Sequence, residues 1–295
     1  MKALFKKAVR RLLAGRLMAE FQADYAGAQE VQRTLLAQYI AMRDWPVGKL
    51  PRFSDVGFQK YSQFEEDGIL LFLFALIGTA SRKVVEVCAG DGQECMAANL
   101  IINHGWKGYL FDGDDSDVAK GRDFFARRKT LLLDQPEYRK AWITAENINQ
   151  LLSEIGAEGE VDLFSLDIDG MDYWVWQAVE RIQPRVCVFE TVNYIPSDLA
   201  LTARYSPDFN MLNKQGLEQY YRGASTLAMV KLSREKGYRL IGAHRHGFNC
   251  IFMKNGVGEE YFPEVTVQQC HDNDITRQGQ ASLWPQIRQF DWQPV

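Results

Sequence analysis

Short apolar runs alternate with longer segments of helical periodicity along most of the chain. Four runs have the length and composition of buried strands, and these are residues 84–87, 109–111, 161–166 and 186–189. Three segments have the spacing of helices that pack on a sheet, and these are residues 69–77, 117–128 and 145–156. This alternation predicts an α/β domain with a mostly parallel sheet and helices on both faces.

The second half of the chain completes the pattern. Residues 224–237 read as a helix, residues 238–241 and 248–253 as an antiparallel strand pair, and residues 129–133 as a further possible strand. Between residues 191 and 219 the chain has little periodicity and contains several tyrosines and prolines. Long irregular connections in compact domains are often binding loops, so we expect this segment to be an acceptor loop.

The first 50 residues differ from the rest. Six basic residues and no acid fall within the first sixteen positions, and apolar residues recur there at helical intervals. Such a basic amphipathic helix fits an anionic membrane surface, or packing on the domain or on a second copy of the chain. Residues 27–43 continue as helix, and a proline-containing linker follows at 45–51. We therefore expect an N-terminal helical extension over 1–50 and one domain over 51–295.

Carboxylates follow the predicted strands in a regular way. Two glycines, Gly90 and Gly92, turn the chain just after Glu86, and Asp112 ends the next strand. The third and fourth strands deliver further acids at 167–169 and at 190. The carboxyl ends of parallel strands form the edge where open α/β sheets bind ligands, and an acid there accepts hydrogen bonds from ribose hydroxyls. A carboxylate-rich cleft at this edge suits a cationic cofactor or a metal.

Several of these segments together resemble the FkbM-type S-adenosylmethionine-dependent methyltransferases. The resemblance is carried by residues 61–70, 86–92 and 167–176, and it extends through 221–225 to 247–249. It implies a Rossmann-like class I methyltransferase fold with a mostly parallel seven-stranded sheet. The cofactor contacts expected from the motifs are Gln63, Glu86, Ala89, Gly90, Gly92, Asp112 and Asp167. The chain departs from the usual methyltransferase pattern at Cys88, where that pattern has glycine.

Composition narrows the class of protein. The net charge of −4 gives no electrostatic reason to expect nucleic acid as a partner. The five cysteines are odd in number and widely spaced, which favours reduced thiols in the cytoplasm. No apolar run reaches the length of a membrane span, so membrane contact would be peripheral, at the inner face and through the basic helix.

Methyl transfer to a hydroxyl needs alignment of the reactants and removal of a proton. Asp169 and Glu190 are candidates to take that proton, or to hold Mg²⁺ through oxygen ligands. His246 is a third candidate base, and His244 lies two residues before it on the same face of an extended segment.

These observations and the resemblance lead to the hypothesis of an S-adenosylmethionine-dependent O-methyltransferase. The resemblance implies that it acts on a saccharide hydroxyl, in bacterial surface glycan biosynthesis. A saccharide or glycan would be the acceptor, and the N-terminal helices leave a homo-oligomer open. Two alternatives remain. A metal-dependent glycosyltransferase would use the Asp-x-Asp sequences at 112–114 and 167–169, and a non-catalytic scaffold would keep the fold without binding the cofactor.

Overall fold

A computed structural model describes residues 28–128 and 135–295 of the chain. Two compact units are present, Met1–Trp45 and Pro46–Val295. In the first unit, residues 28–40 form a helix, as the sequence predicts. The basic amphipathic helix expected in the first seventeen residues and the strand expected at 129–133 lie outside the described residues.

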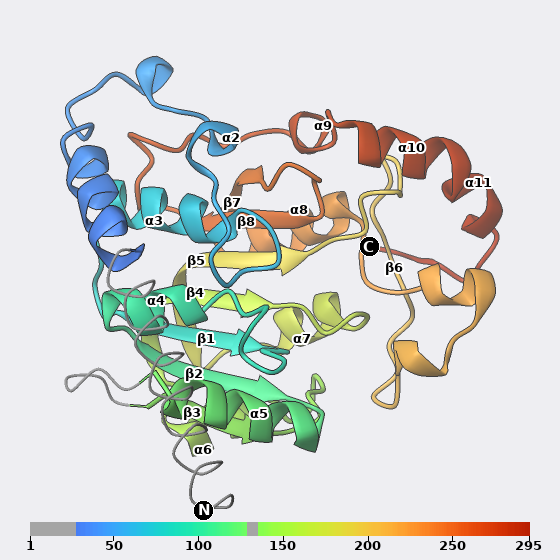
Figure 1. Cartoon of the computed structure of the whole chain (residues 1–295). Helices are drawn as coiled ribbons and strands as arrows, with labels where there is room; N and C mark the ends of the chain where they lie inside the picture. Colours follow the sequence, from blue (N-terminus) through green and yellow to red (C-terminus); the bar gives the residue numbers. More distant parts are fainter. Residues whose placement is uncertain (1–27, 129–134) are drawn as a thin grey trace, which may run out of the picture. The chain divides into compact units, whose positions relative to one another are not determined.

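The core of the second unit is a seven-stranded sheet in the order β3-β2-β1-β4-β5-β8-β7 (Figure 1). Its strands are β1 (Lys83–Val87), β2 (Lys107–Asp112), β3 (Glu137–Lys140), β4 (Gly159–Leu166), β5 (Ile182–Glu190), β7 (Tyr238–Ala243) and β8 (Asn249–Lys254). Strands β1 to β5 run parallel to one another, and β8 is antiparallel to both β5 and β7. This strand order is that of the class I methyltransferase fold, which confirms the predicted fold class.

The strand order creates a switch point between β1 and β4. From β1 the chain winds through β2 to β3 on one side, and β4 then returns beside β1 and leads to β5 on the other. At such a point the connections leave the two strands in opposite directions, so a crevice opens beyond their carboxyl ends. The sequence places the glycine turn after β1 and the acids of residues 167–169 after β4, on either side of this crevice.

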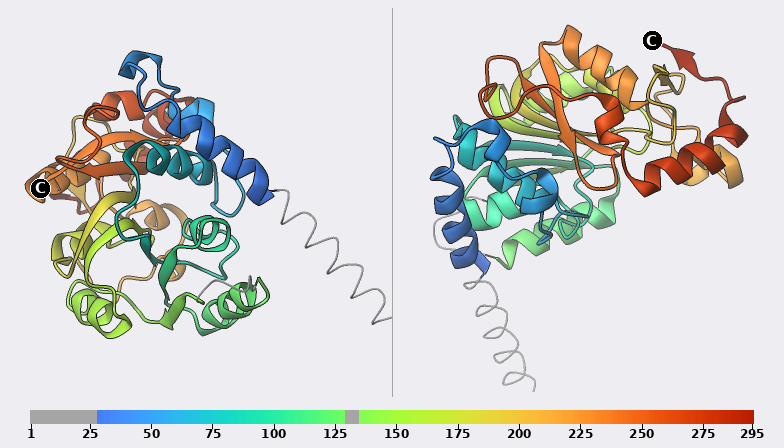
Figure 2. Two further views of the ribbon diagram at one scale, coloured as in Figure 1. Left: turned by 90° about the vertical axis from the view of Figure 1, so that its left-hand side faces the viewer. Right: turned by 90° about the horizontal axis from the view of Figure 1, so that it is seen from above.

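Helices cover both faces of the sheet (Figure 2). The helices of the domain are α2 (Phe53–Val56), α3 (Glu66–Ile77), α4 (Ala98–His104), α5 (Asp115–Ala126), α6 (Ile148–Ile155), α7 (Asp172–Ala178), α8 (Thr226–Glu235), α9 (Val267–Cys270), α10 (Asp274–Ser282) and α11 (Trp284–Ile287), with 3-10 turns η1 (Val47–Lys49), η2 (Met211–Asn213) and η3 (Gly216–Tyr220). Side chains of α6, α7 and α8 share one buried cluster with Val85, Phe164 and Phe252 of the sheet. The opposite face is covered by α3, α4 and α5 (Figure 1). No helix within the described ranges is both long and apolar enough to cross a membrane.

A smaller layer, which we call the cap, consists of residues 191–223 and 273–295. The arrowheads of β1, β2, β4 and β5 point toward it in Figure 1. The cap has its own buried cluster, which includes Val192, Ile195, Ile287 and Trp292, and a short antiparallel pair of β6 (Leu201–Thr202) with β9 (Gln293–Pro294). The irregular segment predicted as an acceptor loop thus forms a large part of a packed layer at the carboxyl edge of the sheet.

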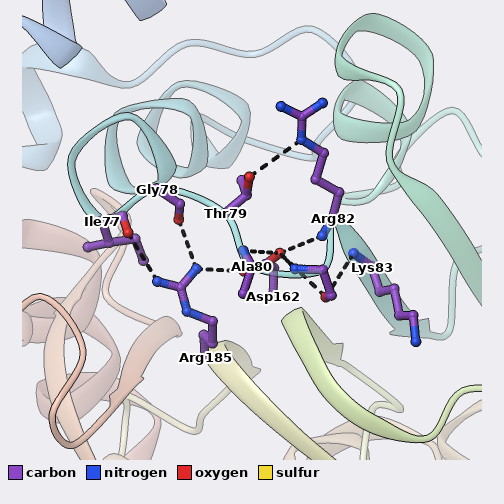
Figure 3. A network of polar contacts seen from close by, with 9 residues as sticks. Ile77, Gly78, Thr79, Ala80, Arg82, Lys83, Asp162 and Arg185 are labelled. Atoms are coloured by element: carbon purple, nitrogen blue, oxygen red, sulfur yellow. Dashed lines mark hydrogen bonds and ion pairs between the residues drawn. The ribbon is translucent and has the colours of Figure 1, made fainter.

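At the end of the sheet away from the carboxyl ends of the parallel strands, one buried carboxylate joins β4 to β5 and to the segment that precedes β1 (Figure 3). Asp162 of β4 is fully buried and accepts hydrogen bonds from the backbone N–H groups of residues 80–82, at 2.6 to 3.0 Å. Arg185 of β5 donates to the same carboxylate at 2.7 Å and also to the carbonyls of Ile77 and Gly78. The α3–β1 connection is therefore tied to β4 and β5 at the edge far from the crevice.

Candidate functional site

The turn after β1 is a backbone cradle open to ligand. Gly90 and Gly92 have φ of 56° and 81°, in the left-handed region that favours glycine. A Cβ placed on Gly90 would meet nothing within 4 Å, whereas one on Gly92 would lie 3.0 Å from the ring of Phe124. Ala89, which directly precedes Gly90, is fully buried, and its carbonyl accepts a hydrogen bond from the N–H of Gly92 at 3.1 Å. Gly92 therefore packs the turn on α5, and the space next to Gly90 is open.

Asp112 holds this turn from the neighbouring strand. One carboxylate oxygen accepts from the N–H of Gly90 at 2.9 Å, and the other accepts from the N–H of Asp114 at 2.8 Å. The hydroxyl of Tyr138 donates to the carbonyl of Gly90 on the same turn. An ionised carboxylate has about four lone-pair sites, so two remain for ribose hydroxyls. The structure thus brings together two of the predicted cofactor residues in one arrangement.

Glu86 precedes the turn, and both of its carboxylate oxygens already accept hydrogen bonds within the protein. Its two carboxylate oxygens accept from the N–H groups of Met96 and Ala97, at 2.9 and 2.6 Å, and from the thiol of Cys95 at 3.0 Å. Burial raises the pKa of Glu86 to about 7. These contacts give Glu86 a structural role, because they shape the connection into α4. A direct contact of Glu86 with the cofactor stays a prediction.

Gln63 lies in a loop whose backbone is held by hydrogen bonds to Asp67. One carboxylate oxygen of the buried Asp67 accepts from the N–H groups of residues 60–62, at 2.6 to 2.9 Å. The carbonyl of Tyr61 in turn accepts from the N–H of Cys95 at 3.0 Å, next to the loop that Glu86 holds. The side chain of Gln63 is exposed in this loop, beside the connection that leads into α4. Contact between Gln63 and the cofactor stays a prediction.

Cys88, the departure from the glycine pattern, has a φ of 70° and an exposed side chain. The left-handed region costs a non-glycine residue about 1 to 2 kcal/mol, partly offset by the greater unfolded-state freedom of glycine. Cys88→Gly is therefore expected to raise the free energy of unfolding by about 0.5 to 1 kcal/mol and to tighten cofactor binding, because a side chain leaves the crevice. Urea denaturation and calorimetry measure the two effects.

The matched control for that substitution is Arg82→Gly, because Arg82 also has a positive φ, of 51°, at an exposed position away from the crevice. It should raise stability without a change in cofactor affinity. Weaker cofactor binding by Cys88→Gly would show that the thiol takes part in the site.

Three carboxylates gather beyond β4 and β5. Single oxygens of Asp167, Asp169 and Glu190 lie within 4.8 Å of one another, and all three residues are partly buried. The buried carboxylate of Asp172 shapes the loop that carries two of them, because it accepts from the N–H groups of Ile168 and Gly170, at 2.9 and 3.1 Å. The structure thus brings together Asp169 and Glu190, as predicted, and places Asp167 with them.

Arg222 completes this cluster. Its guanidinium donates to Asp169 and also to Glu190, the latter at 3.4 Å. Asp167 and Glu190 lie close together, and burial raises the pKa of both carboxyls. Asp169 is more open than Glu190, with a side chain 46% exposed against 19%. Of these two carboxylates, Asp169 is therefore better placed to meet a ligand.

The predicted Mg²⁺ site can be tested against these contacts. The three carboxylates are close enough to share one ion, and oxygen is the ligand that Mg²⁺ prefers. However, the guanidinium of Arg222 is bonded to both predicted ligands, Asp169 and Glu190. The cluster with Arg222 in place therefore fits an organic cation and not a metal ion.

His246 occupies a different part of the edge. Its ring packs against Phe64 and Phe248, with centroids 4.8 and 6.2 Å apart, and its carbonyl accepts from Asn193. Within residues 28–128 and 135–295, no hydrogen bond joins its side chain to the carboxylate cluster. His244 is buried beside it, and its Nε2 has no hydrogen-bond partner among the described residues. A catalytic role for His246 stays a prediction, whereas His244 belongs to the core.

Burial lowers the pKa of His244 to about 3 and that of His271 to about 4. Between these values and the ordinary value of 6.5, the unfolded state binds protons that the folded state does not. Stability should therefore fall as the pH falls through this window, by about 1.4 kcal/mol per pH unit for each histidine. In His244→Gln the loss between pH 6.5 and 4.5 should be smaller than in the wild type, as measured by urea denaturation. Parallel curves would contradict this.

Sequence reasoning missed two residues at the carboxyl edge. Arg222 lies just before α8, within residues 221–225 that carry part of the sequence resemblance, but no periodicity there indicates the direction of its side chain. Trp142 follows β3, and its ring lies against Gly113, next to Asp112, where an added Cβ would be 3.1 Å away. The indole N–H donates to the carbonyl of Pro207 in the cap at 3.1 Å, and the side chain is 47% exposed. Trp142 thus offers a fixed aromatic surface beside the glycine turn.

No family model matches the sequence, and no curated protein matches it. Solved structures with a similar arrangement include an S-adenosylmethionine-dependent methyltransferase from Clostridium acetobutylicum, at 10% identity and a TM-score of 0.42 over 67% of this chain and 93% of that one. Another is the O-methyltransferase from Bacillus cereus in complex with SAH, at 14% identity and a TM-score of 0.39 over 76% and 89% of the two chains. These likenesses are distant, and the strand order of the sheet carries the fold assignment.

Proposed function

We propose that the protein is an S-adenosylmethionine-dependent O-methyltransferase of the FkbM type that methylates a saccharide hydroxyl. The observation that carries the proposal is the Gly90 turn held by Asp112 at the switch point of a class I methyltransferase sheet. The open space above Gly90 and the remaining lone pairs of Asp112 fit a nucleoside cofactor. The carboxylate cluster follows the strand on the other side of the same crevice.

In this proposal each part of the edge has one task. Gly90, Asp112 and Trp142 bind the cofactor, which supplies an activated methyl group when bound. Asp169 would take the proton that the acceptor hydroxyl loses while its oxygen bonds to the methyl carbon and the bond from that carbon to the sulfonium sulfur breaks, which leaves a neutral thioether. Arg222 orients the Asp169 carboxylate. A positioned base contributes about 10²- to 10⁴-fold, and alignment of the two reactants contributes more.

The acceptor side supports a saccharide. Aromatic side chains of the cap lie around the loop that carries Asp169, because Phe209 packs on Gly170 and Tyr205 lies 5.9 Å from the ring of Trp174. Tyr220 is 36% exposed, and its carbonyl accepts from the hydroxyl of Tyr194. Exposed aromatic faces with a polar edge suit the apolar faces and hydroxyls of sugar rings. We further propose a surface glycan or its precursor as the acceptor; membrane contact through the N-terminal helix and a homo-oligomer are parts of this proposal that need their own tests.

The glycosyltransferase alternative depends on Asp-x-Asp pairs that hold a metal. In the first pair, Asp112 holds the Gly90 turn, and Asp114 caps α5 by accepting from the N–H groups of Ser116 and Asp117. In the second pair, Asp169 is bonded to Arg222. These contacts favour methyl transfer over a metal-held sugar nucleotide.

The test is transfer of a labelled methyl group from S-adenosylmethionine to a panel of nucleotide sugars, oligosaccharides and polysaccharide ends. We expect label on a hydroxyl oxygen. Asp169→Asn should abolish most of this transfer, whereas Asp198→Asn, at an exposed position of the cap, should leave it unchanged. Transfer to an amine or carboxylate acceptor alone would contradict the saccharide assignment.

A further inference from the structure

Arg222 is fixed in place by the backbone around it. The N–H of Gly223 donates to the carbonyl of Gly170 at 2.7 Å, and the carbonyl of Gly223 accepts from the N–H of Ala203 at 2.9 Å. Gly223 itself has a φ of 62°, and an added Cβ would lie 3.0 Å from a methyl group of Val192. The loop that carries Arg222 is therefore joined directly to the loop that carries Asp169. The backbone on which Arg222 lies is thus held in place next to the cluster by hydrogen bonds.

The guanidinium lies where the carboxylates would need to meet an ion. It contacts Asp169 and Glu190 together, and only 23% of its side chain is exposed. A guanidinium supplies several N–H donors in a rigid plane, so one group can bond two carboxylates at once. Mg²⁺ requires near-octahedral oxygen ligands at about 2.1 Å, and a guanidinium bonded to the same oxygens leaves no room for that shell. Occupancy by Arg222 and occupancy by a divalent ion therefore exclude each other.

We propose that Arg222 is the resident cation of the Asp167, Asp169 and Glu190 cluster and that it makes the site independent of divalent metal. Arg222 is then a positioning residue, which acts on the acceptor through Asp169. The metal-binding part of this inference stands on the contacts of Arg222 alone, and the catalytic part rests on the proposed function.

The first test measures Mn²⁺ binding by electron paramagnetic resonance, which does not depend on any activity. The wild type should bind no stoichiometric Mn²⁺ at submillimolar concentration. Arg222→Met removes the charge and keeps much of the bulk of the side chain. It should bind one Mn²⁺ at least about tenfold more tightly than the wild type, a difference of about 1.4 kcal/mol in binding free energy. Arg222→Lys keeps a positive charge and should bind as weakly as the wild type.

The control is Arg245→Met, because Arg245 also pairs with a buried carboxylate, that of Glu65, away from the cluster. It should gain no Mn²⁺ site. Tight stoichiometric binding of Mn²⁺ by the wild type would overturn the proposal whether or not the Arg222 variants fold, and so would equal binding by Arg222→Met and Arg222→Lys.

A second test uses methyl transfer once an acceptor is known. Turnover by the wild type should change less than twofold after removal of metal with EDTA. Arg222→Met should lose turnover and regain part of it with Mg²⁺, because the ion then takes the place of the guanidinium. Loss of wild-type turnover in EDTA would overturn the proposal. Absence of any methyl transfer would count against the proposed function, while the Mn²⁺ result would still decide the role of Arg222.

Discussion

Asp162→Ala is expected to lower the free energy of unfolding by about 3 to 5 kcal/mol, the usual loss when one partner of a buried ion pair is removed. Asp162 is fully buried and accepts from three successive backbone N–H groups and from Arg185. Its removal leaves these N–H groups without their acceptor and a guanidinium, 12% exposed, without its counter-ion. Since the free energy of unfolding of most domains is only about 5 to 15 kcal/mol, this single change would remove a large part of the stability.

Urea denaturation followed by circular dichroism measures this effect. Glu160→Ala is the matched control, because Glu160 is an exposed acid two residues earlier on the same strand. Its substitution should change stability by less than about 0.5 kcal/mol. If the two variants had similar midpoints, the Asp162 network in Figure 3 would not be the tie between the α3–β1 connection and the sheet.

The second large effect is expected on cofactor affinity. Asp112→Ala should weaken binding of S-adenosylmethionine by about 10- to 100-fold, because a hydrogen bond to a charged group contributes about 1.5 to 3 kcal/mol. Two causes act together in this variant. The ribose hydroxyls lose their acceptor, and the N–H of Gly90 loses the carboxylate that fixes the turn.

Calorimetry of Asp112→Ala and Asp115→Ala separates this effect from a general change of charge. Asp115 is exposed, begins α5 and pairs only with Lys140, at 3.3 Å, among the ion pairs of the described residues. Its substitution should leave the affinity within about twofold, since surface ion pairs contribute little. Equal affinities of the wild type and Asp112→Ala would show that the ribose site lies elsewhere.

Much of the sheet follows from the sequence because its central strands are buried on both faces. Such strands read as short continuous apolar runs, and those of β1, β2, β4 and β5 were predicted close to their observed bounds. Strand β3 was not predicted at its observed position, Glu137–Lys140. Its four residues are Glu-Tyr-Arg-Lys, and an edge strand with one buried side chain has no apolar run to mark it.

The acids of the candidate site were predictable for a related reason. Each directly follows or ends a recognisable strand, and parallel strands bring their carboxyl ends to one edge. Arg222 lies within residues 221–225, which carry part of the sequence resemblance, but no strand or helix pattern there indicates its pairing with Glu190, 32 positions earlier. Asp162 was hidden within an apolar run, and its partner Arg185 lies 23 positions away on the next strand. Pairings of this kind depend on the register of strands and loops, which periodicity does not determine.

Calorimetric titration of the full chain with S-adenosylmethionine tests the central claim most directly, with S-adenosylhomocysteine and sugar nucleotides titrated beside it, each with and without Mg²⁺. The proposed function predicts one site for the first two ligands, with a micromolar dissociation constant that Mg²⁺ does not change. A folded protein that binds neither of them would contradict it, and binding of a sugar nucleotide alone, dependent on Mg²⁺, would favour a glycosyltransferase instead.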